Sequence, residues 1–384
     1  MKIRVAIIGI SGYGLVHFEH IRKLADQGKV ELAAAVVINP DQVQKQLEIL
    51  KNYNTKIYAS TQEMYADFSG KLDLVCIPTG IAFHEPMTIE ALRNGASVLV
   101  EKPAAGSVAD IEKMQKAEKE AEGKFVAVGF QHTYARELQF IKRYLLTGRL
   151  GAIRNITVKG LWPRNDSYYH RNNWAGKIKS ASGAWILDSP INNAFAHYLN
   201  IELFLAGKTF KTSATPNGID AELYRARKEI ETFDTCGVRV KTNEGATITA
   251  LFTHTTQRND NPQMRIDCEK GSIYWKVDES WNIRSASGRL LYSGIAEQPH
   301  DDMFADVIAR LHDPEVFTCS LDIAKAHAIC IEKLYQNFTP KQLTSASVTR
   351  TEPDGQYLLK DVEAIFEQCY QKNLLPSEAG ADWN

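Results

Sequence analysis

The N-terminal part of the chain alternates short apolar runs with amphipathic segments. The apolar runs cover residues 4–8, 31–38, 72–77, 97–100 and 125–129, and helical patterns cover residues 17–27, 86–94 and 108–121. Short apolar strands separated by helices are typical of a parallel sheet covered on both faces. The pattern predicts an α/β protein whose residues 1–130 form a doubly wound domain around a parallel sheet.

Beyond about residue 150 the pattern becomes rich in β-structure. Strand patterns cover residues 153–160, 237–241, 246–254, 265–269 and 271–277, and helical patterns cover residues 194–205, 322–337 and 356–370. The turn Asn243-Glu244-Gly245 predicts an antiparallel hairpin, and we expect the tail after Leu375 to be frayed. Residues 131–384 should form an α+β domain with a large, mostly antiparallel open sheet, which serves substrate binding and oligomerisation.

A glycine-rich loop, Gly9-Ile10-Ser11-Gly12-Tyr13-Gly14, follows the first strand and opens the first helix. Glycines permit a tight turn and close approach of the backbone to a pyrophosphate, and the helix N-terminus offers free N–H groups to it. Ser11 replaces the second glycine of the G-x-G-x-x-G fingerprint. We therefore predict that residues 1–130 are a Rossmann domain that binds a dinucleotide. The predicted contacts are Gly9, Ser11, Gly12, Tyr13 and Gly14.

The end of the second strand leaves the choice between NAD and NADP open. Sites that prefer NAD usually carry Asp or Glu there for the ribose 2′-hydroxyl. The segment Val36-Val37-Ile38-Asn39-Pro40 has no acid, and no Lys or Arg follows at once to bind a 2′-phosphate. Asn39 can hydrogen-bond either group.

The triplet Glu101-Lys102-Pro103 completes a set of motifs that resembles the Gfo/Idh/MocA family, the glucose–fructose oxidoreductase and inositol dehydrogenase group. The matching segments are Gly9–Gly14 with His17, Pro78-Thr79 with His84, the triplet itself, Gly148–Gly151 and Trp174-Ala175-Gly176. The resemblance implies an NAD(P)-dependent oxidoreductase that moves a hydride to or from a secondary alcohol of a sugar or polyol. It also implies that Pro78, Thr79, His84 and Glu101 line the cofactor site.

The same resemblance implies that Lys102 lies at the nicotinamide, before a peptide bond that is often cis. Hydride transfer needs a base for the hydroxyl proton and positive charge or donors near the developing oxyanion. A lysine at the carboxyl end of a parallel strand points into the ligand crevice. The alternative is a surface lysine in an ordinary turn.

The family's second catalytic pair is usually Asp-x-x-x-His, and the chain departs from this pattern. Asp188 is followed four residues later by Asn192, whereas His197 is preceded four residues earlier by Asn193. We predict His197 as general acid and base, because imidazole titrates near neutrality. Asn193 would hold the substrate hydroxyl or orient the imidazole. Asp188 would cap a helix that begins near Ser189-Pro190, or contact substrate.

Aromatic, Arg and Asn side chains interleave over residues 162–174. Sugar faces stack on aromatic rings, and sugar hydroxyls require convergent donors and acceptors. We predict that Arg164, Tyr169, His170 and Trp174 bind substrate. A structured surface loop or a subunit contact is the alternative.

Composition narrows the remaining choices. The net charge of −1 gives no electrostatic basis for binding nucleic acid or an anionic membrane, and the six cysteines include no C-x-x-C pair. We expect reduced thiols, no metal site and a cytoplasmic protein. An exposed sheet face would need covering, so we expect a homodimer or homotetramer, by analogy with relatives. Two further hypotheses are an NAD-dependent glycoside hydrolase and a non-catalytic sugar or cofactor sensor.

Overall fold

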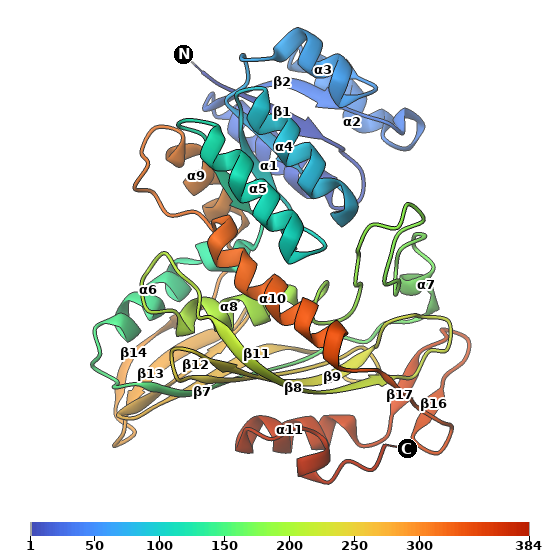
Figure 1. Ribbon diagram of the computed structural model, residues 1–384, viewed down its shortest axis with the longest axis vertical. Helices are drawn as coiled ribbons and strands as arrows, with labels where there is room; N and C mark the ends of the chain where they lie inside the picture. The colour runs from blue at the N-terminus through green and yellow to red at the C-terminus, as the bar shows by residue number, and fades with distance from the viewer. Residues whose placement is uncertain (1, 384) are drawn as a thin grey trace. The chain divides into compact units, whose positions relative to one another are not determined.

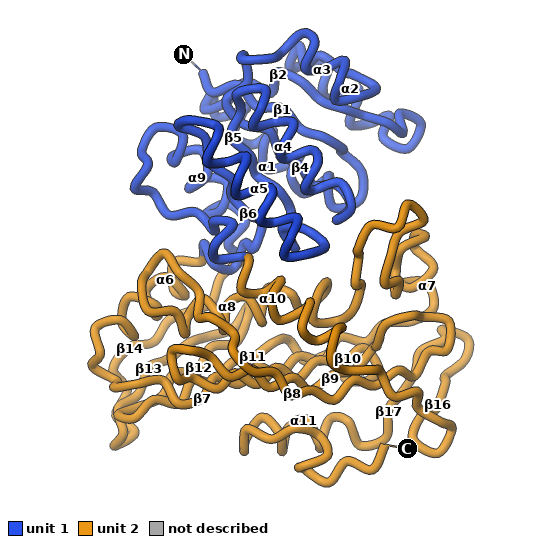
Figure 2. The backbone as a smooth tube through the Cα atoms, viewed as in Figure 1, with its two compact units in different colours: residues 1–134, 299–324 blue, residues 135–298, 325–384 orange. Residues whose placement is uncertain are grey.

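The computed structural model describes residues 2–383 and divides into two compact units, coloured separately in Figure 2. Unit 1 contains the chain up to Tyr134 together with residues 299–324, and unit 2 contains residues 135–298 and the chain from Lys325 onward. A segment that follows most of unit 2 in the sequence therefore returns to complete unit 1.

Unit 1 is built on a six-stranded parallel sheet with the strand order β3-β2-β1-β4-β5-β6. Its strands are β1 (Ile3–Ile8), β2 (Val30–Val36), β3 (Lys56–Tyr58), β4 (Leu74–Ile77), β5 (Ser97–Val100) and β6 (Val126–Val128). The central strands β4 and β5 are buried at every residue, because helices cover both faces. The predicted doubly wound Rossmann domain is confirmed.

Helices connect these strands and cover the sheet (Figure 1). They are α1 (Gly14–Asp26), α2 (Gln44–Asn52), α3 (Thr61–Phe68), α4 (His84–Arg93), α5 (Val108–Glu120) and the later α9 (His300–Arg310). Ser60 and Ser107 cap α3 and α5 by accepting backbone N–H groups, as N-cap serines do. The returning α9 packs on α1, where the rings of Phe304 and His20 stack at 5.2 Å.

Unit 2 is built on a nine-stranded sheet with the order β14-β13-β12-β11-β7-β10-β9-β8-β15. Its strands are β7 (Ile153–Leu161), β8 (Pro216–Arg225), β9 (Thr235–Thr242), β10 (Thr247–Thr253), β11 (Asp260–Cys268), β12 (Gly271–Lys276), β13 (Ser280–Ser285), β14 (Leu290–Ile295) and β15 (Lys341–Gln342). Only the pairs β10–β7 and β15–β8 are parallel. The mostly antiparallel sheet and the hairpin β9–β10 are therefore confirmed.

Helices lie on both faces of the central part of this sheet (Figure 1). The helices of unit 2 are α6 (Arg136–Leu146), α7 (Asp166–Tyr169), α8 (Ala196–Ala206) and α11 (Val362–Lys372), and α10 (Leu321–Asn337) begins in unit 1 and continues in unit 2. Successive residues of β10 separate the two faces, as strand geometry requires. Phe252 stacks on Phe195 beside α8, whereas Leu251 belongs to the core under α11.

Two expectations about unit 2 are wrong, and a third holds only in part. The segment 356–370 is not one helix, because β17 (Tyr357–Leu359) pairs with β16 (Val348–Arg350) before α11 begins. The tail is docked rather than frayed, since Trp383 is 3% exposed and donates its indole N–H to the carbonyl of Lys360. The sheet face that we expected to be exposed is covered by α11 and this tail over β7, β8 and β10, whereas most residues of β14 stay exposed or half-buried.

All six cysteines are free thiols, and only Cys268 is not fully buried. The redox state of these thiols stays a prediction. In residues 2–383 we find no helix with the length and apolar character required to cross a bilayer.

Candidate functional site

The predicted phosphate loop lies between β1 and α1, and its conformation requires glycine. Gly9 and Gly12 have φ of +89° and +56°, values that residues other than glycine rarely adopt. A Cβ at Gly14 would lie 2.6 Å from the carbonyl oxygen of Gly9. The backbone N–H of Gly9 donates to the carbonyl of Val36 at 2.9 Å, which anchors the loop to β2.

The loop also has room and polarity for a pyrophosphate. No side chain caps α1, and its first turn contains no acidic residue that would repel phosphate. A Cβ at Gly12 would meet no atom within 4 Å, so the space above the loop is open. Exposed Ser11 and Gly12, with the positive end of the helix dipole behind them, therefore fit a dinucleotide.

Glu101 and Lys102 follow β5 at the same edge of the sheet. Glu101 is 4% exposed, and its Oε1 lies 2.8 Å from Nε2 of His17 on α1. Burial alone would raise the pKa of Glu101, but the hydrogen bond and charge of His17, with Lys102 adding to them, lower it overall. A Cβ at Gly129 would lie 2.4 Å from Glu101 Oε1, so the β6 terminus leaves space for this carboxylate.

The lysine itself is partly exposed, and the peptide bond between Lys102 and Pro103 is cis. Its backbone N–H donates to the Glu101 carboxylate at 3.1 Å. The buried carboxylate thus fixes the turn that carries the ammonium group. Lys102 is placed at a strand end, as its predicted role requires.

His84 links two loops of the same sheet edge. Its Nδ1 lies 2.8 Å from the carbonyl oxygen of Pro103, and its Nε2 lies 3.0 Å from that of Thr79. The ring is fully buried, so the structure gives it a positioning role. Thr79 and buried Pro78 follow β4, and Asn39 is exposed after β2. Direct contacts of these residues with the cofactor stay predictions.

Asp188 and Asn193 lie together in unit 2. Asp188 Oδ1 accepts a hydrogen bond from Asn193 Nδ2 at 2.7 Å, and Oδ2 accepts one from the N–H of Gly176 at 2.6 Å. Residues 189–195 form turns, and α8 begins only at Ala196. The predicted helix start at Ser189-Pro190 is therefore wrong, and Asp188 caps no helix.

His197 lies in the first turn of α8 and is 7% exposed. Asn193 precedes this helix, so the two residues do not share a helical face as their spacing suggested. The turn reaches α8 through Phe195, whose N–H donates to the carbonyl of Pro190 at 2.8 Å. His197 therefore follows Asn193 by one turn-rich segment of the chain. The catalytic roles of both residues stay predictions.

The predicted substrate residues differ in their surroundings. Tyr169 is buried, and the guanidinium carbon of Arg227 lies 4.5 Å from its ring centroid, which indicates packing. Trp174 is half-buried, and its N–H donates to the side chain of Asn172 at 3.1 Å. His170 is exposed and Arg164 is half-buried.

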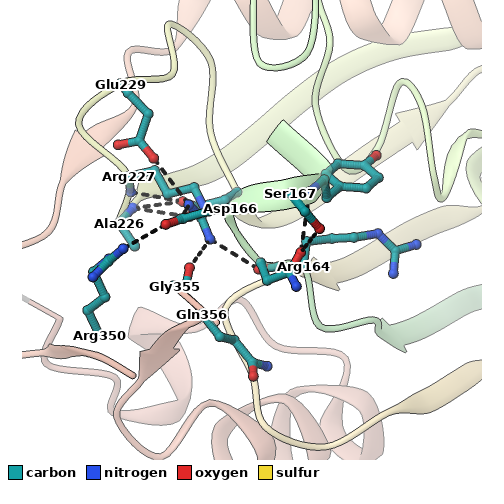
Figure 3. Close-up of polar contacts among 12 residues, drawn as sticks. Arg164, Asp166, Ser167, Ala226, Arg227, Glu229, Arg350, Gly355 and Gln356 are labelled. Atoms are coloured by element: carbon teal, nitrogen blue, oxygen red, sulfur yellow. Dashed lines mark hydrogen bonds and ion pairs between the residues drawn. The ribbon is translucent and has the colours of Figure 1, made fainter. Parts of the chain in front are cut away.

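Arg227 is the centre of a buried network (Figure 3). Its side chain is 1% exposed and pairs with Asp166 and, at 3.1 Å, with Glu229. It also donates to the carbonyl oxygens of Arg164 at 3.2 Å and Gly355 at 2.6 Å. This network ties the 162–174 segment to two distant parts of unit 2. No local sequence signal marks it, because its members lie 61 and 128 residues apart.

The parallel sheet, the glycine loop and the Glu101–Lys102 edge define a dinucleotide-binding protein of the Rossmann class. Residues 3–130 match the model of the oxidoreductase family with an NAD-binding Rossmann fold, and residues 138–274 match the Gfo/Idh/MocA C-terminal domain. The chain belongs to the Gfo/Idh/MocA family, whose N-terminal domain binds NAD.

The following relatives are distant. Inositol 2-dehydrogenase of Burkholderia multivorans is 24% identical over 205 residues, which are 53% of this chain and 55% of that protein, so the chain spans about half the length of the curated relatives it matches. The WlbA dehydrogenase of Bordetella pertussis, solved with NADH and UDP-GlcNAcA, has a TM-score of 0.70 and 24% identity over 88% of this chain and 96% of that one. Aldose–aldose oxidoreductase of Caulobacter crescentus has a TM-score of 0.69 and 19% identity over 88% and 97% of the two chains. These structural likenesses establish the fold.

Proposed function

We propose that the protein catalyses NAD(P)-dependent hydride transfer to or from a secondary alcohol of a sugar or polyol. The observation that carries the proposal is the position of Lys102. It lies at the carboxyl end of a parallel strand, at the same sheet edge as the phosphate loop, and a buried carboxylate fixes its turn. The relatives named for inositol and aldoses, and the one solved with a nucleotide sugar, support a sugar-like substrate.

When the alcohol is oxidised, its carbon loses a hydride and its hydroxyl loses a proton. The nicotinamide of the bound dinucleotide supplies the hydride acceptor. Lys102 stabilises the negative charge that develops on the substrate oxygen. His197 takes the hydroxyl proton, and Asn193, held by Asp188, binds a neighbouring hydroxyl.

This division of roles requires Lys102 of unit 1 and His197 of unit 2 to reach one substrate, which stays a prediction. It also leaves the cofactor open between NAD and NADP, since Asn39 suits both.

The experiment begins with the purified protein and identification of any nucleotide that accompanies it. A panel of sugars and polyols, tested with NAD and with NADP, is then followed by the absorbance of the reduced nicotinamide. We expect at least one substrate to be oxidised, and Lys102→Met to lower kcat by roughly 100-fold or more while NADH still binds. Full activity in Lys102→Met would contradict the proposed mechanism. Glycoside hydrolysis without net cofactor reduction would favour the hydrolase hypothesis instead.

A further inference from the structure

Two arginines of the 162–174 segment surround one tyrosine ring. The guanidinium carbon of Arg164 lies 4.8 Å from the ring centroid of Tyr168, and that of Arg171 lies 3.6 Å from it. Arg164 also lies 5.8 Å from the ring of Trp162, and Arg171 lies 5.1 Å from that of Trp174. We call Arg164 and Arg171 the arginine pair. Aromatic faces hold both side chains in place without neutralising them.

The arginine pair differs from its neighbours in having no counter-ion. Arg227 and Arg350 both pair with Asp166. Among residues 2–383, by contrast, no carboxylate forms an ion pair with Arg164 or Arg171. Their guanidinium N–H groups donate to backbone carbonyls, of Pro163 at 3.0 Å and of Tyr168 at 2.5 Å, and Arg164 also interacts with the hydroxyl of Tyr168. The Nε of Arg164 is buried without a hydrogen-bond partner.

Nearby titratable groups offset this charge only in part. Asp188 acts electrostatically on Tyr168, and its carboxylate oxygens accept hydrogen bonds from the neutral donors of Gly176 and Asn193. The ring of His254 lies 5.7 Å from that of Tyr168. Burial lowers the pKa of His254 to about 3, and the charges of both arginines act in the same direction, so this imidazole is neutral at physiological pH. Around Tyr168, two guanidinium charges therefore face one carboxylate charge, that of Asp188, with which neither arginine forms an ion pair.

The arginine pair is connected to the start of α8 through packed rings. His254, which touches Tyr168, stacks on Phe195 at 5.3 Å, and Trp162 stacks on the same Phe195 at 4.6 Å. Phe195 immediately precedes α8, and His197 is in its first turn. The arginine pair thus packs, through these rings, against the segment that leads into α8 and His197.

We propose that the arginine pair binds an anionic group of the substrate, a carboxylate or a phosphate, so that the substrates are acidic rather than neutral sugars. This inference rests on the proposed sugar oxidoreductase function and names its substrate class. Guanidinium groups match the planar, bidentate geometry of carboxylate and phosphate oxygens. The anion supplies the ion-pair partner that no carboxylate of residues 2–383 provides for these two arginines.

The test compares three sugars that share one ring, namely glucose, glucuronate and glucose 6-phosphate. Binding of each to the NAD-loaded full-length protein is measured by titration calorimetry, and oxidation by the absorbance of the reduced nicotinamide. We expect at least one charged sugar to bind about tenfold or more tightly than glucose. Its identity distinguishes a carboxylate site from a phosphate site.

Variants then test the residues. Arg171→Gln and Arg164→Gln should weaken binding of the charged sugar about 10- to 100-fold, chiefly through KM, and Arg171→Lys should restore only part of the loss. The matched control Arg154→Gln removes an exposed arginine that pairs with Glu269 on the same unit, and should leave binding within twofold.

The outcomes separate this inference from the function on which it rests. Equal binding of charged and neutral sugars, or equal loss of both in the arginine variants, would overturn the anionic site while leaving a sugar oxidoreductase intact. Charge-selective binding that depends on the arginine pair, without oxidation of any sugar, would support the anionic site and contradict the proposed function.

Discussion

The buried guanidinium of Arg227 provides the sharpest test of how unit 2 holds its 162–174 segment. Replacing it by Met keeps an unbranched apolar stem but removes the charge, the ion pairs with Asp166 and Glu229, and the bonds to two carbonyl oxygens. Breaking a buried ion pair by removing one partner costs about 3–5 kcal/mol, because the other charge is left uncompensated. Asp166 keeps Arg350, so we expect a loss near the lower end of that range.

The matched control is Arg350→Met. The side chain of Arg350 pairs with the same Asp166 but is 39% exposed. An ion pair exposed to this extent contributes about 0–1 kcal/mol. Free energies of unfolding come from urea titrations, and hydrogen exchange reports order in residues 162–174. We expect Arg227→Met to accelerate exchange there and Arg350→Met to leave it almost unchanged. Equal, small losses in both variants would refute the assignment of Arg227 as the centre of the network.

Three further predictions concern other parts of the chain. Neither carboxyl oxygen of fully buried Glu202 has a hydrogen-bond partner, and burial raises its pKa well above 4.5. Above pH 4.5 the folded state therefore binds more protons than the unfolded state, so the free energy of unfolding falls as pH rises. Glu202→Leu should flatten this decline in urea titrations at several pH values, and should raise stability at pH 7 by about 1–3 kcal/mol; a less stable variant would contradict this. Gly14→Ala should weaken NADH binding about tenfold or more, since the new Cβ would lie 2.6 Å from a backbone oxygen, whereas Gly218→Ala meets nothing closer than 3.7 Å and should bind normally. Arg239 and a backbone N–H lower the pKa of Glu378 to about 2, so this pair stabilises the fold above pH 4.5 and loses its effect as pH falls toward 2. Thermal unfolding of Glu378→Gln should match the wild type only at the acidic end, and a constant difference at all pH values would oppose this assignment.

The sequence allowed the nucleotide-binding unit to be predicted well, because its determinants are local. Parallel strands such as β4 are buried on both faces and appear as continuous apolar runs. The glycine loop and the Glu101-Lys102 turn follow such runs directly, so their position at the sheet edge could be inferred from the chain alone.

The structure of unit 2 was harder to predict, because side-chain contacts override the local preference of its segments for helix or strand. Pro190 suits a first helical turn, yet the side-chain amide of Asn192 donates to the carbonyls of Ile186 and Leu187 and holds a turn there instead. The short apolar run of β17 fits a helix as well as a strand, because periodicity cannot distinguish them over so few residues. Its pairing with β16 decides for the strand and is not visible in the local sequence. The Arg227 network likewise depends on contacts between distant segments.

The return of residues 299–324 to unit 1 has a consequence for synthesis of the chain. The backbone carbonyl of Cys319 accepts a hydrogen bond from the N–H of Val128 at the end of β6. The backbone N–H of Cys319 donates to the hydroxyl of Tyr134. These partners leave the ribosome long before Cys319 does, with β7 to β14 translated in between. Unit 1 therefore stays incompletely packed until residues 299–324 have been synthesised. Its folding is completed late in translation, and not when its first 134 residues have emerged.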